Sequence, residues 1–333
     1  MMDNREIHET ANSVRFEVAG MTLDAAVGFI FIALSVASLY LLVAIGLSII
    51  FGSLKYVNMA HGVLYLGGAY FGLLIASSEE YGGLLSEYGA LGLDWGFVPA
   101  LILTPIVFFV LGVAMERFLA KPFYDRDLLD QLLVTFGVLI AAQELFAIVF
   151  GRTGTIYPRP EWLAGAISLP LIGTPPGMSS ASTIRVLVVT LTLVLIAVIF
   201  AFFKYTDYGL AVRAGTEDSE MAEMLGIRVG RPFLLIFAIG AAYAGLAGVL
   251  GGSLFNVTTD IGMEIIIPSL VIVIMGGVGS LRGTVVGSLL AGLVFAVATV
   301  IEPSMTNASI YLLAIVVLTI KPSGIYPSAK IGQ

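Results

Sequence analysis

The chain has 333 residues, of which 58% are hydrophobic and 12% charged, and its net charge is −7. Soluble domains carry about 25% charged residues, so a core of this size cannot hide that much apolar surface from water. The composition excludes a soluble globular domain and predicts an all-α, polytopic integral membrane protein in a lipid bilayer. A negative net charge without a basic patch argues against nucleic-acid binding. The absence of cysteine excludes disulfides, and two histidines leave little material for a metal site.

Apolar windows of about 20 residues predict eight or nine transmembrane helices, with broken or re-entrant segments as an option. They lie near 26–51, 58–77, 97–117, 131–150, 184–203, 233–255, 264–280, 284–301 and 307–320. A polar tail at 1–24 lacks the basic-then-apolar pattern of a signal peptide. The transmembrane domain then covers 25–321, and a second tail covers 322–333. Pro268 and the glycine-rich stretch 276–283 leave a tight hairpin, a broken helix and a re-entrant segment as alternatives.

The positions of basic residues predict the orientation. If the loop 204–232 is cytoplasmic and the helices alternate outward, most lysines and arginines fall inside. Those inside are Lys55, Arg117, Lys121, Arg126, Lys204, Arg213, Arg228, Arg231, Arg282, Lys321 and Lys330, and those outside are Arg5, Arg15, Arg152, Arg159 and Arg185. The acidic loop 78–96 then lies outside. So does the proline-rich loop 151–183, which suits an external docking or capping surface.

Residues 53–72 ("SLKYVNMAHGVLYLGGAYFG") bring two polar residues, Asn58 and His61, to the entry of an apolar run. His61 is a candidate proton relay or substrate contact, although a hydrogen-bonded residue at a helix end is the more common case. Asn58 is a candidate pathway residue or a helix cap. Gly68 and Gly72 offer a small-residue face for close helix packing. Glycine-rich stretches also recur further along the chain, which hints at an internal duplication.

Three polar residues, Thr135, Gln143 and Glu144, interrupt the apolar run at 131–150. Because charge in lipid is expensive, such residues tend to face a cavity or a partner. Glu144 falls within the predicted span. It is interpreted either as a pathway residue or as a neutral acid hydrogen-bonded to a neighbouring helix. Glu264 stands at the end of a later span and is expected to reach the interface.

Residues 213–231 ("RAGTEDSEMAEMLGIRVGR") form a compact charged segment between two apolar runs. Thr216 is predicted to cap a helix of about ten residues, with acidic residues such as Asp218 in its first turn. Gly226 is placed to end this helix in a left-handed conformation.

One apolar stripe is predicted on that helix, because Met221, Met224 and Leu225 follow i, i+3, i+4 spacing. Two interpretations stay open. The stripe either lies on the membrane interface or inserts into a groove of a soluble partner.

No lysine follows the spacing of a P-loop, so the chain does not hold ATP phosphates by that motif. No nucleophile elbow or acid–base pair stands at usable spacing either. The chain is therefore predicted not to be an enzyme, and any ATP-driven motor would be a separate polypeptide.

The chain resembles the permease subunits of branched-chain amino acid ABC importers, in particular the LivH-type branch. Four stretches carry the resemblance and together cover most of the chain from 40 to 295. They are "GLSIIFGSLKYVNMAHGVLYLGGAY" (46–70), "LLVTFGVLIAAQELFAIVFG" (132–151), the charged segment 213–231 and "IMGGVGSLRGTVVGSLLAGL" (274–293). The last contains Gly276, Gly277 and Gly279, which join Asn58, His61, Gly68, Thr135, Gln143 and Glu144 as candidates for the pathway or for helix packing.

The resemblance also implies a role for the charged segment. Importer permeases carry an E-A-A-x-x-x-G loop that docks on the ATPase. Glu220, Ala222 and Gly226 hold its first, third and seventh positions, whereas Met221 replaces the middle alanine and the following I-x-L-P is missing. The residues expected to couple the chain to an ATPase are Arg213, Thr216, Asp218, Glu220, Met221, Ala222, Met224, Leu225 and Gly226.

The resemblance further implies a multi-pass subunit of the cytoplasmic membrane. Its partners would be cytoplasmic ABC ATPases, an external solute-binding protein, and a sister permease or second copy. The chain would bind no cofactor, since ATP and magnesium act on the ATPase. One alternative keeps this architecture but imports urea, short amides or simple sugars. Another is an ion-coupled secondary transporter that uses Glu144 and His61 as a proton path.

Overall fold

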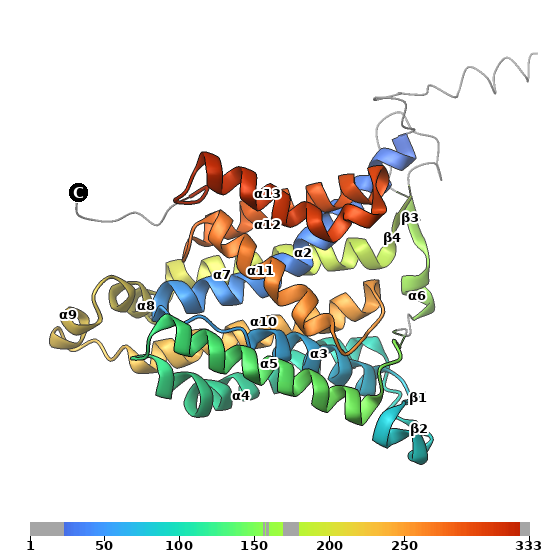
Figure 1. Ribbon diagram of the computed structural model, residues 1–333, viewed down its shortest axis with the longest axis horizontal. Coiled ribbons are helices and arrows are strands. Elements are labelled where there is room, and N and C mark those ends of the chain that lie inside the picture. Colours follow the sequence, from blue (N-terminus) through green and yellow to red (C-terminus); the bar gives the residue numbers. More distant parts are fainter. Residues whose placement is uncertain (1–22, 156, 158–159, 169–179, 327–333) are drawn as a thin grey trace, which may run out of the picture.

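The computed structural model describes residues 23–155, 157, 160–168 and 180–326. Residues 1–22 of the first predicted tail and 327–333 of the second therefore lie outside the described residues. Within them the fold is all-α, with long helices running side by side (Figure 1). Among the described residues, seven helical spans are long and apolar enough to cross a membrane. They correspond to α2 (Leu23–Leu54), α4 (Phe97–Met115), α5 (Leu128–Phe150), α7 (Thr183–Tyr205), α10 (Gly230–Leu254), α12 (Leu281–Ile301) and α13 (Thr306–Ile320), the last together with the turn that begins at Pro303. Two apolar helices are shorter, α3 (His61–Ala76) and α11 (Ile261–Gly276).

Small elements mark the two ends of the bundle (Figure 1). The end called here the β end carries β1 (Glu79–Glu80) paired with β2 (Ala90–Leu91), a 3₁₀ turn (Gly83–Tyr88), α6 (Glu161–Ala164), and β3 (Ala166–Ser168) paired with β4 (Ser180–Ser182). A further 3₁₀ turn (Pro303–Met305) joins α12 to α13. The opposite end, called the α9 end, carries α8 (Asp207–Glu217), α9 (Ser219–Met224), a π turn (Glu116–Ala120) and a 3₁₀ turn (Lys121–Phe123).

Basic residues gather at the α9 end. Among the described residues, every lysine and arginine except Arg152 and Arg185 belongs to the helix ends and turns on that side. Since cytoplasmic loops carry the excess of positive charge, this distribution predicts a cytoplasmic α9 end and an external β end. The described residues that were assigned to the inside from sequence thus lie on one side, while Lys330 lies outside the described residues.

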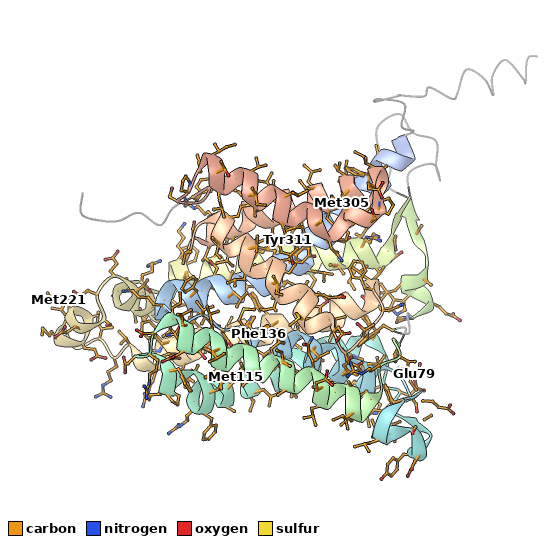
Figure 2. All side chains as sticks on the ribbon, in the orientation of Figure 1. Glu79, Met115, Phe136, Met221, Met305 and Tyr311 are labelled. Carbon is orange, nitrogen blue, oxygen red and sulfur yellow. The ribbon has the colours of Figure 1, made fainter. Side chains whose placement is uncertain are left out.

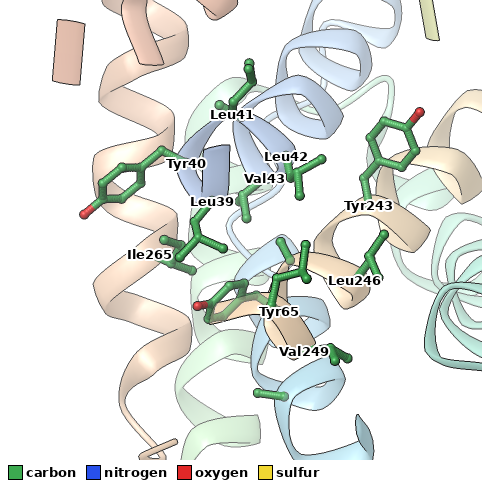
Figure 3. Packing of buried hydrophobic residues seen from close by; sticks show 14 of the residues in the cluster. Leu39, Tyr40, Leu41, Leu42, Val43, Tyr65, Tyr243, Leu246, Val249 and Ile265 are labelled. Carbon is green, nitrogen blue, oxygen red and sulfur yellow. The ribbon is translucent and has the colours of Figure 1, made fainter. Parts of the chain in front are cut away.

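Buried helices form the centre of the molecule. Most of α2 and α10 is buried, and so is most of the short α3, whereas only a minority of the residues of α4, α5, α7 and α13 are buried. Leu42, Tyr65 and Leu246 represent the three central helices in the core (Figure 3). A helix that is apolar on all sides suits such a central position, and the surrounding helices present their apolar side chains to lipid.

Two units of the fold share one design, in which a long helix is followed by a non-helical segment and a short helix. In the first unit, α2 runs to the α9 end, residues 55–60 turn back into the molecule, and α3 continues to the β end. In the second, α10 runs to the β end, residues 255–260 turn back, and α11 continues to the α9 end. The units therefore run in opposite directions. The first turns of α3 and α11 meet where Gly62 and Gly262 lie against each other.

A sequence repeat accompanies this inverted design. Residues 52–62 read "GSLKYVNMAHG" and residues 252–262 read "GSLFNVTTDIG". Gly-Ser-Leu, a valine and the last glycine match in position. Oppositely oriented repeats with interrupted helices are typical of membrane transporters. Recurrent glycine alone gave only a weak hint of duplication, whereas this aligned pattern locates the two copies.

Glycines let α10 approach α2 and α3 closely. A methyl group added to Gly68 would lie 2.6 Å from the Cα atom of Gly245, and one added to Gly46 would lie 3.0 Å from that of Gly240. Gly72, the second glycine of the predicted small-residue face, also packs against α10. Such backbone contacts supply van der Waals packing where lipid removes the usual hydrophobic drive between helices.

The glycine-rich stretch 276–283 forms a tight hairpin between α11 and α12. Ser280 caps α12, because its side chain accepts a hydrogen bond from the Gly283 N–H at 3.1 Å. Pro268 lies inside α11 and does not divide it. Of the three alternatives left by the sequence, the structure has the hairpin. The interruptions of the fold lie instead at 55–60 and 255–260.

Replacing Gly68 with alanine is expected to lower the thermal unfolding temperature of the protein in detergent, because overpacking a close contact costs about 1–3 kcal/mol. Gly137→Ala is the matched control, since Gly137 lies within α5 and an added methyl group meets nothing within 4 Å. Fluorescence-monitored unfolding measures both variants. Equal unfolding temperatures would contradict a packing role for Gly68.

Candidate translocation and coupling sites

The charged segment contains parts of two short helices, the end of α8 and all of α9, rather than one helix. Thr206 caps α8 by accepting a hydrogen bond from the Gly209 N–H at 3.0 Å. The predicted cap at Thr216 is wrong, because Thr216 lies inside α8 and its hydroxyl donates to the Val212 carbonyl. The chain breaks at Asp218 instead, whose carboxylate caps α9 by accepting from the Met221 N–H at 2.9 Å. A carboxylate is a stronger N-cap than threonine and also favours the helix dipole.

Gly226 ends α9 with φ +85°, the left-handed conformation predicted for it. The Ile227 N–H donates to the Ala222 carbonyl and the Gly226 N–H to the Glu223 carbonyl, both at 2.9 Å. These two bonds define a Schellman motif, which closes a helix and satisfies its last carbonyls. Six residues would be too few for a stable isolated helix, so the two caps hold α9 in shape.

The apolar stripe of α9 points away from the bundle. Met221, Met224 and Leu225 are 54%, 73% and 74% exposed, respectively. Figure 2 shows Met221 at the far tip of the α9 end. Ala222 faces the other way and is buried. Three large apolar side chains on one exposed helix face are typical of a protein or membrane contact.

The base of α8 is fixed to the bundle. The Arg213 guanidinium donates to the Phe203 carbonyl near the end of α7. Gly215 of α8 packs against Val229, the residue before α10, since an added methyl group would lie 2.7 Å from Val229 Cγ1. Only Thr206 separates α7 from α8, so the two helices are joined without a long linker.

Side chains of α5 hold the first non-helical segment. The Val57 N–H donates to Gln131 Oε1 and the Met59 N–H to Thr135 Oγ1, each at 3.1 Å. Gln131 Nε2 also donates to the carbonyls of Phe123 and Arg126. A backbone without helical hydrogen bonds at membrane depth must find such partners within the protein. Thr135 was selected from the sequence, whereas Gln131 was missed because it stands at the start of the predicted span.

The same helix reaches the second non-helical segment. Gln143 Nε2 donates to the Asp260 carbonyl at 3.2 Å, just before α11. The buried residues of α5 recur every four positions and form one stripe: Gln131, Thr135, Leu139, Gln143 and Ala147. This stripe brings Thr135 and Gln143 to the two interruptions of the fold. Helix spacing in the sequence contained that signal, since i, i+4 residues share a face.

Asn58 and His61 are buried at the start of α3. Ala60 is the N-cap residue of α3 and no side chain caps it, so the alternative of an Asn58 cap is wrong. The His61 ring packs against α2, because a methyl group on Gly46 would lie 2.7 Å from Nε2. No described residue accepts or donates a hydrogen bond at either side chain, so His61 is not the hydrogen-bonded residue that was expected.

Glu144 is neither buried nor hydrogen-bonded to a neighbouring helix, which corrects its interpretation as a neutral buried acid. Its carboxylate forms an ion pair with Arg152 at 2.6 Å near the external end of α5, and both side chains are exposed. This hydrogen bond, and then the carboxylate charge, raise the pKa of the Arg152 guanidinium above its usual value. His61 contacts α2 instead, so the structure does not join the two residues of the suggested proton path.

Three glycines of the α11–α12 hairpin have backbone conformations or close contacts that a side chain would disturb. Gly277 and Gly279 have φ values of +109° and +74°, which L side chains rarely adopt. A methyl group on Gly276 would lie 2.5 Å from the carbonyl carbon of Gly283, and one on Gly52 would lie 2.5 Å from Gly279 Cα. These glycines therefore form a turn against the end of α2.

The comparisons with known proteins agree with this architecture. Residues 29–320 match the family described as branched-chain amino acid transport system / permease component. The chain belongs to this permease family. No solved structure is significantly similar to the chain.

Curated relatives align over most of their length. The permease is 28% identical over 300 residues to the high-affinity branched-chain amino acid transport system permease protein LivH of Escherichia coli, covering 89% of this chain and 93% of the relative. It is 29% identical over 299 residues to BraD of Pseudomonas aeruginosa, covering 88% and 92%. It is 26% identical over 273 residues to a probable LivH of Methanocaldococcus jannaschii, covering 78% and 77%. The permease is accordingly a multi-pass membrane transport component.

Thr135→Val is expected to destabilise the permease by about 1–3 kcal/mol, because it leaves the buried Met59 N–H without an acceptor. Thr135→Ser keeps the hydroxyl and is the matched control. Thermal unfolding in detergent measures the difference. If the Thr135→Val and Thr135→Ser variants unfold at the same temperature, the hydroxyl does not hold the segment 55–60.

Proposed function

We propose that the chain is the membrane-spanning subunit of an ATP-driven importer of branched-chain amino acids. Membership of the permease family and the names of its relatives support the amino-acid substrate over urea, short amides or sugars. The exposed apolar stripe on the capped helix α9 supports coupling to a separate motor. Nothing in the geometry favours the ion-coupled alternative.

The cytoplasmic partner in this proposal is a pair of ABC ATPases, on which ATP and magnesium act. Each ATPase would receive one α9 in a surface groove, with Met221, Met224 and Leu225 as anchors. Glu220, Ala222 and Gly226 match the docking loop of importer permeases, and the structure gives them distinct local roles. Ala222 and Gly226 build the Schellman turn, while Glu220 lies in the first turn of α9.

The mechanical step is a rocking of helices. When two ATPases close on ATP, the α8–α9 pair moves with them as a lever. Since α8 adjoins α7 and packs against α2 and α10, the movement reaches the central helices. A sister permease or second copy would complete the pathway, and an external solute-binding protein would deliver substrate at the β end.

Reconstituted transport tests the proposal. Proteoliposomes that contain the permease, its ATPases, a sister permease and the binding protein are expected to accumulate leucine only with internal ATP and external binding protein. Urea and xylose serve as competing solutes. Leucine uptake by the permease alone, driven by a proton gradient, would overturn the proposal.

Gly226→Pro is expected to abolish transport and ATPase co-purification while membrane insertion stays intact. Proline fixes φ near −65°, whereas this position requires +85°. Gly226→Asn is the matched control, since asparagine tolerates the left-handed conformation. Normal transport in the proline variant would remove the coupling role of the turn.

Met224→Asp is expected to reduce ATPase co-purification at least about tenfold, because a charge would enter an apolar groove. Glu223→Ala lies on the same helix outside the stripe and is expected to retain binding. Affinity purification through a tagged permease measures both. Equal recovery of ATPase would indicate that the stripe faces lipid.

A further inference from the structure

A cavity of about 380 Å³ opens at the β end between α2, α11, α12 and α13. Tyr40 and Tyr65 line its inner wall from the central helices, and Glu264 lines it from the first turns of α11. Asn256 and Asn307 are exposed at its external side. Its volume falls in the range of small-molecule sites. Because it faces the side from which an importer receives substrate, the cavity lies where a translocated molecule would first enter.

The absence of a side chain at Gly251 leaves room for the Tyr65 ring in the cavity wall. A methyl group on Gly251 would lie 2.8 Å from the Tyr65 ring carbon that carries the hydroxyl. Tyr40 and Tyr65 project their hydroxyl groups to the same side, with Ile265 between them (Figure 3). Neither hydroxyl forms a hydrogen bond with a described residue, although both side chains are buried. Buried hydroxyls usually find a partner, so these two are available to a ligand.

Glu264 is the one charged residue among the described residues that line the cavity, and it is exposed. Glu264 supplies a carboxylate within electrostatic range of both tyrosines. Ile261, the first residue of α11, also lines the cavity. The N-terminus of a helix carries partial positive charge and unpaired N–H groups, which favour an anionic group. A carboxylate beside a helix N-terminus suits a zwitterion, whose ammonium and carboxylate groups need opposite partners.

Apolar side chains form another part of the lining. Val36, Leu39, Ile265 and Phe295 border the same space. Branched aliphatic and aromatic side chains are complementary to an aliphatic ligand, which gains about 0.8 kcal/mol for each buried methylene. A cavity with a polar side and an aliphatic side matches an α-amino acid with an apolar side chain.

A second cavity provides a contrast. It has about 550 Å³ and lies between α3, α4 and α5, with Val107, Phe108 and Phe146 among its lining residues. No acidic or basic residue lines it, so it has no partner for either charged group of an amino acid. The difference shows that volume alone does not single out the first cavity.

We propose that the cavity bounded by Tyr40, Tyr65 and Glu264 is a transient binding site for a zwitterionic, apolar amino acid on the external side of the permease. Glu264 binds the ammonium group, the α11 N-terminus and the two phenol hydroxyls bind the carboxylate, and Leu39 and Ile265 contact the side chain. The permease then contributes to substrate selection beside the external binding protein. This proposal rests on the proposed import of amino acids.

Direct binding tests the site without a binding protein. The purified permease–ATPase complex in nanodiscs is titrated with radiolabelled leucine, and 4-methylpentanoate, which lacks the amino group, competes. Wild type is expected to prefer leucine. Glu264→Gln is expected to weaken leucine binding about tenfold, the value of one charge-assisted hydrogen bond, and to remove the preference over 4-methylpentanoate. An unchanged preference in this variant would overturn the assignment of Glu264.

Selectivity of transport gives an independent measurement. Ile265→Phe narrows the aliphatic side and is expected to lower the ratio of leucine to alanine uptake at saturating binding protein. Val107→Phe fills the second cavity to a similar extent and is the matched control, with an unchanged ratio. Both variants must keep ATP hydrolysis stimulated by the binding protein. Equal ratios in the two variants would overturn the proposed site.

The two proposals fail in different ways. If the wild-type complex transports leucine but Glu264→Gln and Ile265→Phe change neither binding preference nor selectivity, the site is wrong and the import function stands. If the complete wild-type system does not transport leucine, the import function itself is wrong. Gly251→Ala places a methyl group against the Tyr65 ring and displaces it, so this variant is also expected to lose leucine binding. Leucine binding at the wild-type level in Gly251→Ala would contradict the role of Tyr65.

Discussion

The fold depends on one constraint, which is that backbone polar groups cannot stay unpaired within a membrane. Two segments, 55–60 and 255–260, leave the helical conformation inside the molecule and lose the hydrogen bonds that a helix provides. Gln131 and Thr135 serve the first segment and Gln143 the second, all from α5. One helix thereby contacts both interruptions, and a backbone bridge between Thr155 and Val257 also holds the second.

Close contact between backbones is the second condition. The interrupted helices cross where Gly62 meets Gly262, and α10 passes α3 at Gly68 and Gly245. A larger side chain at any of these positions would push the helices apart. This geometry explains why a chain with 38 glycines forms a dense core in lipid, where packing rather than water expulsion holds helices together.

One helix links the two ends of the molecule. At its cytoplasmic end α10 packs against α8, which carries α9 and its exposed stripe. At its external end α10 supplies Gly251 and Gly252 to the cavity wall and then turns into the segment before α11. Helices that are stiff and closely packed transmit displacement over this length. In the proposed importer, this packing is the route by which a movement of α9 would reach the cavity and the start of α11.

The sequence by itself determined the membrane class, the positions of the helices and the family resemblance, and it predicted the orientation, because composition, apolar length and basic residues are local properties. It also located α9 and its left-handed glycine, since Gly226 and the stripe of Met221, Met224 and Leu225 follow helix spacing. The sequence did not determine which residue is the N-cap of α9, because Thr216 and Asp218 are both good caps. Only the break between α8 and α9 selects Asp218.

Only the tertiary structure decided what the isolated polar residues do. Thr135 and Gln143 bind the backbone of other segments, Glu144 pairs with Arg152, and His61 packs in the core. Each of these partners lies on another helix or in a loop beyond the span, and one sequence does not show which helices meet. Tyr40, Tyr65 and Glu264 came together for the same reason. A cavity is formed by residues distant in the chain, so the physical cause of the site is the packing of the helices and not their individual patterns.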